Sequence, residues 1–245
     1  MLWGTFGVNH ILSLILAFVV SFFIFIGLRK MNKTLKTISI FLLSLAGMSA
    51  IIFNLVTWGS PLEYLPLHMC SITAILLPIV VLSKNNVIGN LLLVWSLGSV
   101  LAIVFNHAQG NYEILSWTFF FYFVPHFLEC AVTIYLFAFK YVKLSVKYIP
   151  STLAITSGIY TIVHLCNKMI NVYCINNNVL NPSGEVVSVN YMYSLKPTVP
   201  LMELMWDIIP YEYWYMYVGI VIIAAYLGII FVAKWLIDKY RMRIV

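Results

Sequence analysis

Two pairs of residues that could perform nucleophilic chemistry lie inside long apolar stretches of the sequence. His68 and Cys70 fall in one stretch, and His126 lies three residues before Glu129 in another. A thiol can attack an acyl ester and hold the acyl group as a thioester when a base such as histidine removes its proton. A carboxylate beside the imidazole can fix the tautomer of that base. Because such groups are costly in hydrocarbon and rarely lie there without a use, our candidate catalytic residues are His68, Cys70, His126 and Glu129.

The spacing of His68 and Cys70 limits how they can act together. On a regular helix, residues two apart face nearly opposite sides, so one lines a cavity while the other packs, unless Pro66 unwinds the turn. In one mechanism, Cys70 attacks the ester with His126 or His68 as the base. In the other, His68 deprotonates the acceptor directly, and Cys70 is a small buried side chain.

The composition of the chain places it outside the soluble classes of protein. Of its 245 residues, 62% are hydrophobic and only 9% are charged, whereas a soluble domain has about 25% charged residues. The net charge of +6 does not indicate nucleic-acid binding, because the basic residues cluster at the ends of apolar stretches. The four cysteines have no paired CxxC spacing, so we expect no metal site and no cofactor.

Seven apolar stretches are long enough to cross a bilayer, which takes roughly 20 residues. We therefore predict an all-α polytopic membrane protein, folded as a single helical bundle over residues 1–245. Of the 14 basic residues, all but Lys168 and Lys196 fall in alternate loops and the C-terminal tail. This bias predicts an N-terminus outside and a C-terminus in the cytoplasm. The predicted spans are residues 7–28, 37–58, 61–83, 87–106, 117–139, 148–171 and 213–233.

The third predicted span has a recognisable start. Ser60 is a capping residue, Pro61 stands at the first helical position, and Glu63 follows three residues after the cap. Pro66 then falls inside the predicted helix and should kink it. Pro125 should kink the fifth span in the same way.

The long loop at residues 172–212 is predicted to lie on the extracytoplasmic side. Its first half is rich in asparagine, and residues 200–210 place apolar side chains at helical spacing opposite two acids. That pattern is typical of a helix lying in the membrane interface. The aromatic run at residues 211–217 indicates an anchor at the membrane surface.

The polar residues of the predicted spans gather on one side of the bilayer. Counting about 1.5 Å per residue along each span places all five histidines and Cys70 in the outer half. This distribution predicts a polar cavity that opens to the outer leaflet. The residues predicted to bind substrate there are Asn54 and His164 from the spans, and Asn190, Tyr191 and Tyr193 from the long loop.

Several short motifs resemble the YwaF-type family of integral membrane proteins. They are Leu65-Pro66-Leu67-His68-Met69-Cys70, Asn190-Tyr191-Met192-Tyr193 with Lys196-Pro197 behind it, and the aromatic run before the last span. The family's eukaryotic relatives include an acyltransferase that moves fatty acyl groups between phospholipids with a cysteine and a histidine. There the cysteine directly precedes the motif histidine, at the position of Leu67, whereas this chain has its cysteine two residues after His68. The resemblance implies acyl transfer that uses His68, with His126 as the fifth-span histidine.

The sequence therefore favours a membrane acyltransferase that moves a fatty acyl group from a phospholipid to a lysolipid or a lipoprotein amine at the outer face. The loop with Asn190, Tyr191 and Tyr193 would cover the site and supply donors to the oxyanion. The alternative is a transporter or binding protein, although the inner half lacks the features of an alternating-access path. A seven-helix sensor shares only the topology. The abundance of Ile, Asn and Lys favours a bacterial source, and we expect the chain in the plasma membrane.

Overall fold

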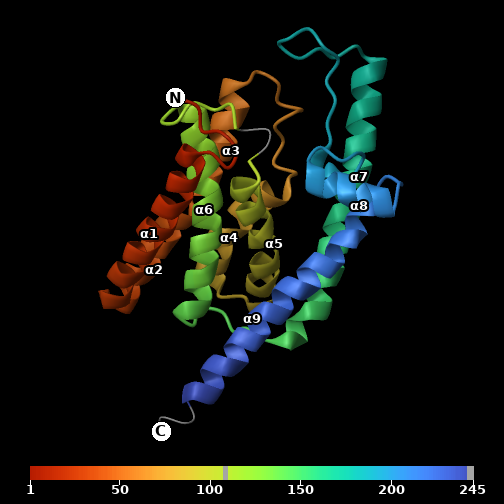
Figure 1. Ribbon diagram of the computed structural model, residues 1–245. Coiled ribbons are helices and arrows are strands. Elements are labelled where there is room, and N and C mark those ends of the chain that lie inside the picture. The colour runs from red at the N-terminus through yellow and green to blue at the C-terminus, as the bar shows by residue number, and fades with distance from the viewer. Residues whose placement is uncertain (107–109, 242–245) are drawn as a thin grey trace. The chain divides into compact units, whose positions relative to one another are not determined.

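Helices make up most of the polypeptide (Figure 1). The structure is a computed structural model that describes residues 1–106 and 110–241. It is 72% helix and, within those residues, has isolated β-bridges but no strand, which confirms the all-α prediction. The α-helices are α1 (Val8–Lys30), α2 (Lys33–Ser44), α3 (Ala46–Thr57), α4 (Met69–Ser83), α5 (Asn86–Val104), α6 (Trp117–Ala138), α7 (Ile149–Asn176), α8 (Pro200–Ile208) and α9 (Gly219–Arg241).

Among the described residues, six helical segments are long and apolar enough to cross a membrane. One is formed by α2 and α3 together, which meet at Leu45, and the others are built on α1, α5, α6, α7 and α9. The apolar helix α4 is shorter, at 15 residues. The polytopic membrane fold is thereby confirmed, and the orientation of the two termini remains a prediction.

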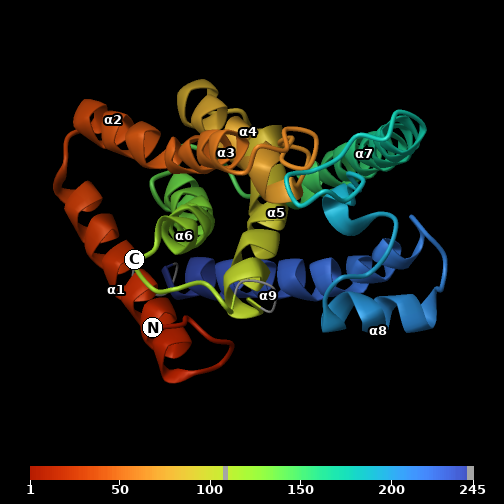
Figure 2. The ribbon, with the colours of Figure 1, turned by 90° about the horizontal axis from the view of Figure 1, so that it is seen from above.

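The chain forms two compact units, residues 1–192 and residues 193–245. In the first unit, α5 packs against α4, α6 and α7, and α6 also contacts α1. Seen from above, α6 lies between α1 and α5 (Figure 2). Close packing, and not exclusion from water, holds such helices together in a bilayer. The buried side chains that α4, α5 and α6 contribute to this packing include Leu77, Val80, Leu92, Val132 and Leu136.

The start of α4 differs from the sequence prediction. Residues 60–64 form an isolated turn, in which Glu63 N–H donates to the carbonyl of Ser60 at 3.0 Å. The helix begins only at Met69, with His68 as the N-cap. The predicted start at Pro61 and the predicted kink at Pro66 are therefore wrong, because Pro66 lies in the loop before the helix. A proline restricts the residue before it to extended backbone, which favours a loop at this point.

The second unit ties its first residues to the aromatic run before α9. The backbone N–H of Tyr213 donates to the carbonyl of Ser194 at 2.7 Å, and the Tyr215 hydroxyl donates to the carbonyl of Tyr193. The short 3₁₀ helix η3 (Tyr215–Val218) contacts α8 and leads into α9, so the α-helix of the last span begins at Gly219, later than residue 213.

Part of the predicted loop is helical in the structure. The α7 helix continues to Asn176, and α8 occupies most of residues 200–210. The extracytoplasmic side of residues 172–212, the interfacial position of α8 and the single domain over residues 1–245 remain predictions.

Candidate functional site

His68 lies in the loop before α4, next to the segment that follows α7. The backbone N–H of Met192 donates to His68 Nδ1 at 3.4 Å, and the ring meets the ring of Tyr191 edge-on with centroids 5.2 Å apart. Because Nδ1 accepts a hydrogen bond, the neutral ring carries its proton on Nε2. Burial and, to a smaller extent, repulsion from His126 together lower the pKa of His68 to about 4. His68 is therefore a neutral hydrogen-bond donor through Nε2 near neutral pH.

Tyr191 holds the loop that leads to His68. Its hydroxyl donates to the carbonyl of Leu62 and accepts from the backbone N–H of Leu65 at 3.1 Å. The side chain is 1% exposed, and burial raises the pKa of Tyr191 to about 12. The predicted substrate-binding residue Tyr191 thus uses its hydroxyl to position backbone, and its ring to contact His68.

Two asparagines of α7 hold the segment that carries Tyr191. The side chain of Asn167 donates to the carbonyl of Tyr191 at 2.8 Å and accepts from its N–H at 2.9 Å. Asn171 makes the same pair of bonds with Val189, at 2.9 and 2.7 Å. Residues four apart share one face of a helix, and residues two apart share one side of an extended segment. The two amides therefore act as a short ladder that fixes the register of the segment on α7.

His126 has the opposite hydrogen-bonding pattern from His68. Its Nδ1 lies 2.6 Å from the carbonyl of Tyr122, one turn earlier in α6. A carbonyl can only accept, so the proton is on Nδ1 and the lone pair is on Nε2. The ring also lies against the ring of Tyr122, with centroids 4.5 Å apart. His126 is consequently oriented as a base through Nε2.

Glu129 is buried where α3, α4, α5 and α6 meet. Its side chain is 3% exposed, and Oε2 accepts a hydrogen bond of 2.6 Å from the hydroxyl of Ser99 on α5. A Cβ added at Gly47 of α3 would lie 2.4 Å from the Cβ of Ala74 and 3.1 Å from Glu129 Oε1. Only glycine leaves room for these helices to approach so closely. The hydrogen-bond donor to Glu129 is Ser99, and the carboxyl interacts with His126 through charge.

Cys70 is the second residue of α4 and has a free thiol. Backbone N–H groups in the first turn of a helix lack intrahelical partners and stabilise negative charge placed beside them. The helical spacing that would place Cys70 and His68 on opposite faces does not apply to them, because His68 precedes the helix. Glu129 attracts His126 and repels the thiolate form of Cys70. The two imidazoles of His68 and His126 repel each other when charged. The structure thus brings the four predicted catalytic residues into one neighbourhood.

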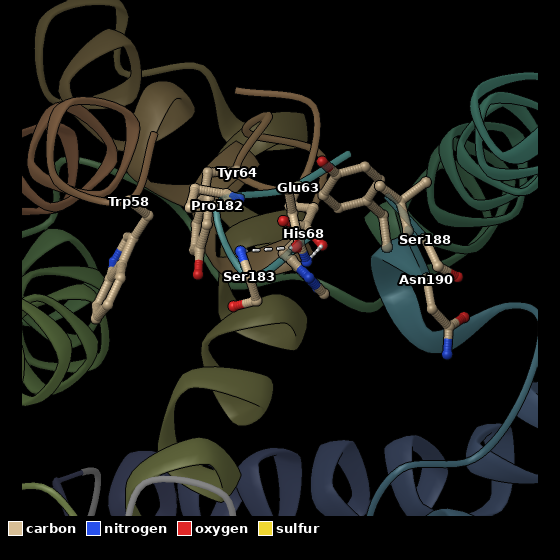
Figure 3. A pocket seen from close by; sticks show the side chains of 11 residues that line it. Trp58, Glu63, Tyr64, His68, Pro182, Ser183, Ser188 and Asn190 are labelled. Atoms are coloured by element: carbon tan, nitrogen blue, oxygen red, sulfur yellow. Dashed lines mark hydrogen bonds between the residues drawn. The ribbon is translucent and has the colours of Figure 1, made fainter. Parts of the chain in front are cut away.

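A polar cavity of about 390 Å³ opens beside His68 (Figure 3). It combines three residues that the sequence singled out, His68, Asn190 and Tyr191, with residues of the α3–α4 loop and of the loop after α7. The remaining lining residues are Trp58, Glu63, Tyr64, Asn181, Pro182, Ser183, Ser188 and Val189. Sequence reasoning missed Trp58 and Glu63 as site residues. The signal that could have found Glu63 is an acid between two aromatic residues, ahead of the His68 motif.

The sequence also singled out Asn54, Tyr193 and three further histidines. Asn54 on α3 accepts a hydrogen bond from Trp58 Nε1 at 3.3 Å, so it supports one wall of the cavity. His164 lies within α7, and Tyr193 belongs to the second compact unit. His10 is fully buried, with Nδ1 accepting from the N–H of Phe6 and Nε2 donating to the carbonyl of Ile103. His107 lies outside the described residues.

Cation ligands do not gather in the part of the chain that the structure describes: no three His, Cys, Asp or Glu side chains there could hold one metal ion. Cys70, His68, His126 and Glu129 offer thiol, imidazole and carboxyl groups, all of which act in acyl transfer.

The family to which the chain belongs follows from comparison with known proteins. No curated protein and no solved structure matches it. One family matches residues 5–231, which is nearly the whole chain and includes every residue of the site described above. The relation to YwaF-type proteins stays a prediction. The chain is a member of the TMEM164 family.

Proposed function

We propose that the protein is a membrane acyltransferase, which moves a fatty acyl group from a phospholipid to a lysolipid or an amine such as that of a lipoprotein. The observation that carries the proposal is the opposite hydrogen bonding of the two histidines. His126 presents a lone pair on Nε2, and His68 presents a proton on Nε2. One ring suits a general base and the other suits an oxyanion donor, which are the two functions that acyl transfer requires.

The first half-reaction forms a thioester at Cys70. His126 Nε2 takes the proton from the thiol, and the thiolate attacks the ester carbonyl of the phospholipid. The tetrahedral intermediate collapses as the carbon–oxygen bond of the ester breaks, and His126 returns the proton to the leaving lysolipid oxygen. Glu129 stabilises the imidazolium that forms on His126 through the charge interaction between them.

The second half-reaction transfers the acyl group to the acceptor. His126 takes the proton of the acceptor hydroxyl or amine as this group attacks the thioester, and the thiol leaves and regains the proton. The Nε2–H of His68 donates to the oxygen that becomes negative in both tetrahedral intermediates.

A route without a covalent intermediate uses the same histidines. His126 then deprotonates the acceptor, which attacks the phospholipid ester directly, and Cys70 only packs. Direct deprotonation by His68 is the less favoured route, because its Nδ1 already accepts the N–H of Met192.

A second candidate function is lipid binding or transport without chemistry. The polar cavity of about 390 Å³ beside His68 favours it, because such a cavity would suit a head group that is bound and released unchanged. Under either function we place the chain in the plasma membrane of a bacterium, with its N-terminus outside.

The test measures transfer from a labelled diacyl phospholipid in vesicles that contain the purified full chain. We expect labelled lysolipid and acyl product with the wild type, and loss of product in His126→Gln. Loss in Cys70→Ser together with a trapped acyl-thioester in the wild type establishes the covalent route. Cys166→Ser, which removes a free thiol on α7, is the matched control and should retain activity. If the wild type forms no product with any lysolipid or amine acceptor, the acyl-transfer proposal is wrong.

A further inference from the structure

The cavity beside His68 has an unusual charge for a site that meets phospholipids. Glu63 is the one lining residue with a formal charge at neutral pH, and no lysine or arginine is among the residues that line it. The Glu63 carboxylate accepts a long hydrogen bond of 3.5 Å from the side-chain amide of Asn181. In the described part of the chain, no cation lies within ion-pair distance of Glu63. The carboxylate therefore provides a negative field in the cavity without a counter-ion.

Two aromatic rings stand in the same cavity as this carboxylate (Figure 3). The rings of Trp58 and Tyr64 are stacked, with centroids 6.0 Å apart and an interplanar angle of 16°. The hydrogen bond from Trp58 Nε1 to Asn54 helps to hold the indole in place. Aromatic faces carry negative partial charge and attract organic cations that lie over them. The indole is the stronger of the two rings in this respect.

We propose that this cavity binds an organic ammonium group, with Glu63 as its counter-ion and Trp58 and Tyr64 as its aromatic wall. A carboxylate without a cation excludes a phosphate or carboxylate as the group bound here, because like charges repel. Ser188 and Asn190, also in the lining, can hydrogen-bond the polar atoms beside the ammonium. The site selects the amine-bearing end of a ligand and leaves the anionic part outside the cavity.

This inference deepens the proposed function, on which its catalytic meaning rests. His68 lines the cavity and is also the proposed oxyanion donor. An ammonium group held by Glu63 therefore places a defined point of the donor or acceptor next to the reacting groups. Binding in itself needs no chemistry, so the two proposals can fail separately.

The experiment measures binding of labelled choline to the purified full chain in a neutral detergent. The competitor is the neutral isostere of choline, in which a tert-butyl group replaces the trimethylammonium group. We expect choline to bind at least about tenfold more tightly than the isostere, because the neutral isostere can make neither a cation–π interaction nor an ion pair with Glu63. Glu63→Gln should weaken choline binding about tenfold, and Trp58→Leu should also weaken it. Glu185→Gln, which changes an exposed acid of the loop after α7, should leave binding unchanged.

The ammonium site is overturned if choline does not bind to the wild type, if choline and its isostere bind equally, or if Glu63→Gln keeps the wild-type affinity. Displacement of choline by glycerol or glucose as effective as by ethanolamine would instead assign the cavity to hydroxyl groups, and would also overturn it. Acyl transfer is measured on the same preparations. Acyl transfer without choline binding would refute the ammonium site but not the acyltransferase proposal. Glu63-dependent choline binding without acyl transfer would refute the acyltransferase proposal but not the ammonium site.

Discussion

The side-chain amide of Asn167 pairs with both backbone groups of Tyr191, as one strand residue pairs with its neighbour in a β-sheet. This pairing joins the middle of α7 to the segment whose tyrosine hydroxyl bonds to Leu62 and Leu65, and whose next N–H bonds to His68. The position of the candidate oxyanion donor therefore depends on Asn167 through the segment that carries Tyr191.

Asn167→Ala should destabilise the protein by about 2–3 kcal/mol, because it leaves a buried N–H and a buried carbonyl of Tyr191 without partners. Asn171→Ala removes an equivalent pair of bonds at Val189, from a less buried position on α7. It should cost less, about 1 kcal/mol. Thermal unfolding in detergent measures both. Equal unfolding temperatures for Asn167→Ala and the wild type would show that the Asn167 pairing does not hold the segment.

Gly47→Ala should destabilise the first compact unit by about 1–3 kcal/mol, since the new Cβ overpacks the contact between α3 and α4. The cause is that a Cβ at residue 47 would lie 2.4 Å from Ala74 Cβ. Adding Ala74→Gly should recover part of the loss, because it removes the atom that clashes. Gly158→Ala is the control, since a Cβ there meets nothing within 4 Å and helix propensity favours alanine. A Gly47→Ala protein as stable as Gly158→Ala would contradict the close packing around Glu129.

The two histidines should show opposite tautomers. In nitrogen NMR of the histidine-labelled protein near neutral pH, we expect one neutral ring protonated on Nε2 and lost in His68→Gln. A second ring, protonated on Nδ1, should disappear in His126→Gln. These assignments follow from the N–H donor at His68 Nδ1 and the carbonyl acceptor at His126 Nδ1. The same tautomer at both positions would contradict the assignment of His126 as the base and His68 as the oxyanion donor.

Acidification should destabilise the protein through His68. Its pKa is lowered to about 4 in the folded protein, whereas an unfolded histidine has a pKa of about 6.5. Between these values the unfolded chain binds more protons, so stability is complete above about pH 6.5 and falls as the pH drops towards 4. The loss amounts to at most about 3 kcal/mol. His68→Gln should show a shallower fall over this window in chemical unfolding. An identical pH profile would assign the acid sensitivity to other groups.

Local patterns in the sequence located the helices but not the start of α4. Long apolar runs identify spans because a bilayer requires backbone groups to be paired within a helix. Ser60, Pro61 and Glu63 fit a helix start, yet the same residues form an isolated turn. What decides between the two is Pro66 and the hydroxyl of Tyr191, a residue 126 positions away from Leu65. No local pattern carries that information.

The residue types of the candidate site could also be predicted from the sequence, whereas the roles of these residues could not. The chemical types of His68, Cys70, His126 and Glu129 were visible in the sequence, because polar groups stand out among apolar ones. Their roles were not, since the proton on each imidazole is set by the N–H of Met192 and the carbonyl of Tyr122. Glu63 was interpreted only as part of a helix start, and Trp58 was not singled out, because their common cavity forms only when the loop after α7 folds against the α3–α4 loop.

The short length of α4 has a consequence for where a lipid meets the protein. Its 15 residues rise about 22 Å, less than the roughly 30 Å hydrocarbon core of a bilayer. We expect the loop before α4 to lie at the level of the hydrocarbon core, where its non-helical backbone groups need hydrogen-bond partners from protein or water. The Tyr191 hydroxyl supplies such partners to the carbonyl of Leu62 and the N–H of Leu65. We therefore expect the polar surface of the membrane to be lowered locally at this end of α4, so that the ester group of a lipid can approach it without its head group being drawn into hydrocarbon.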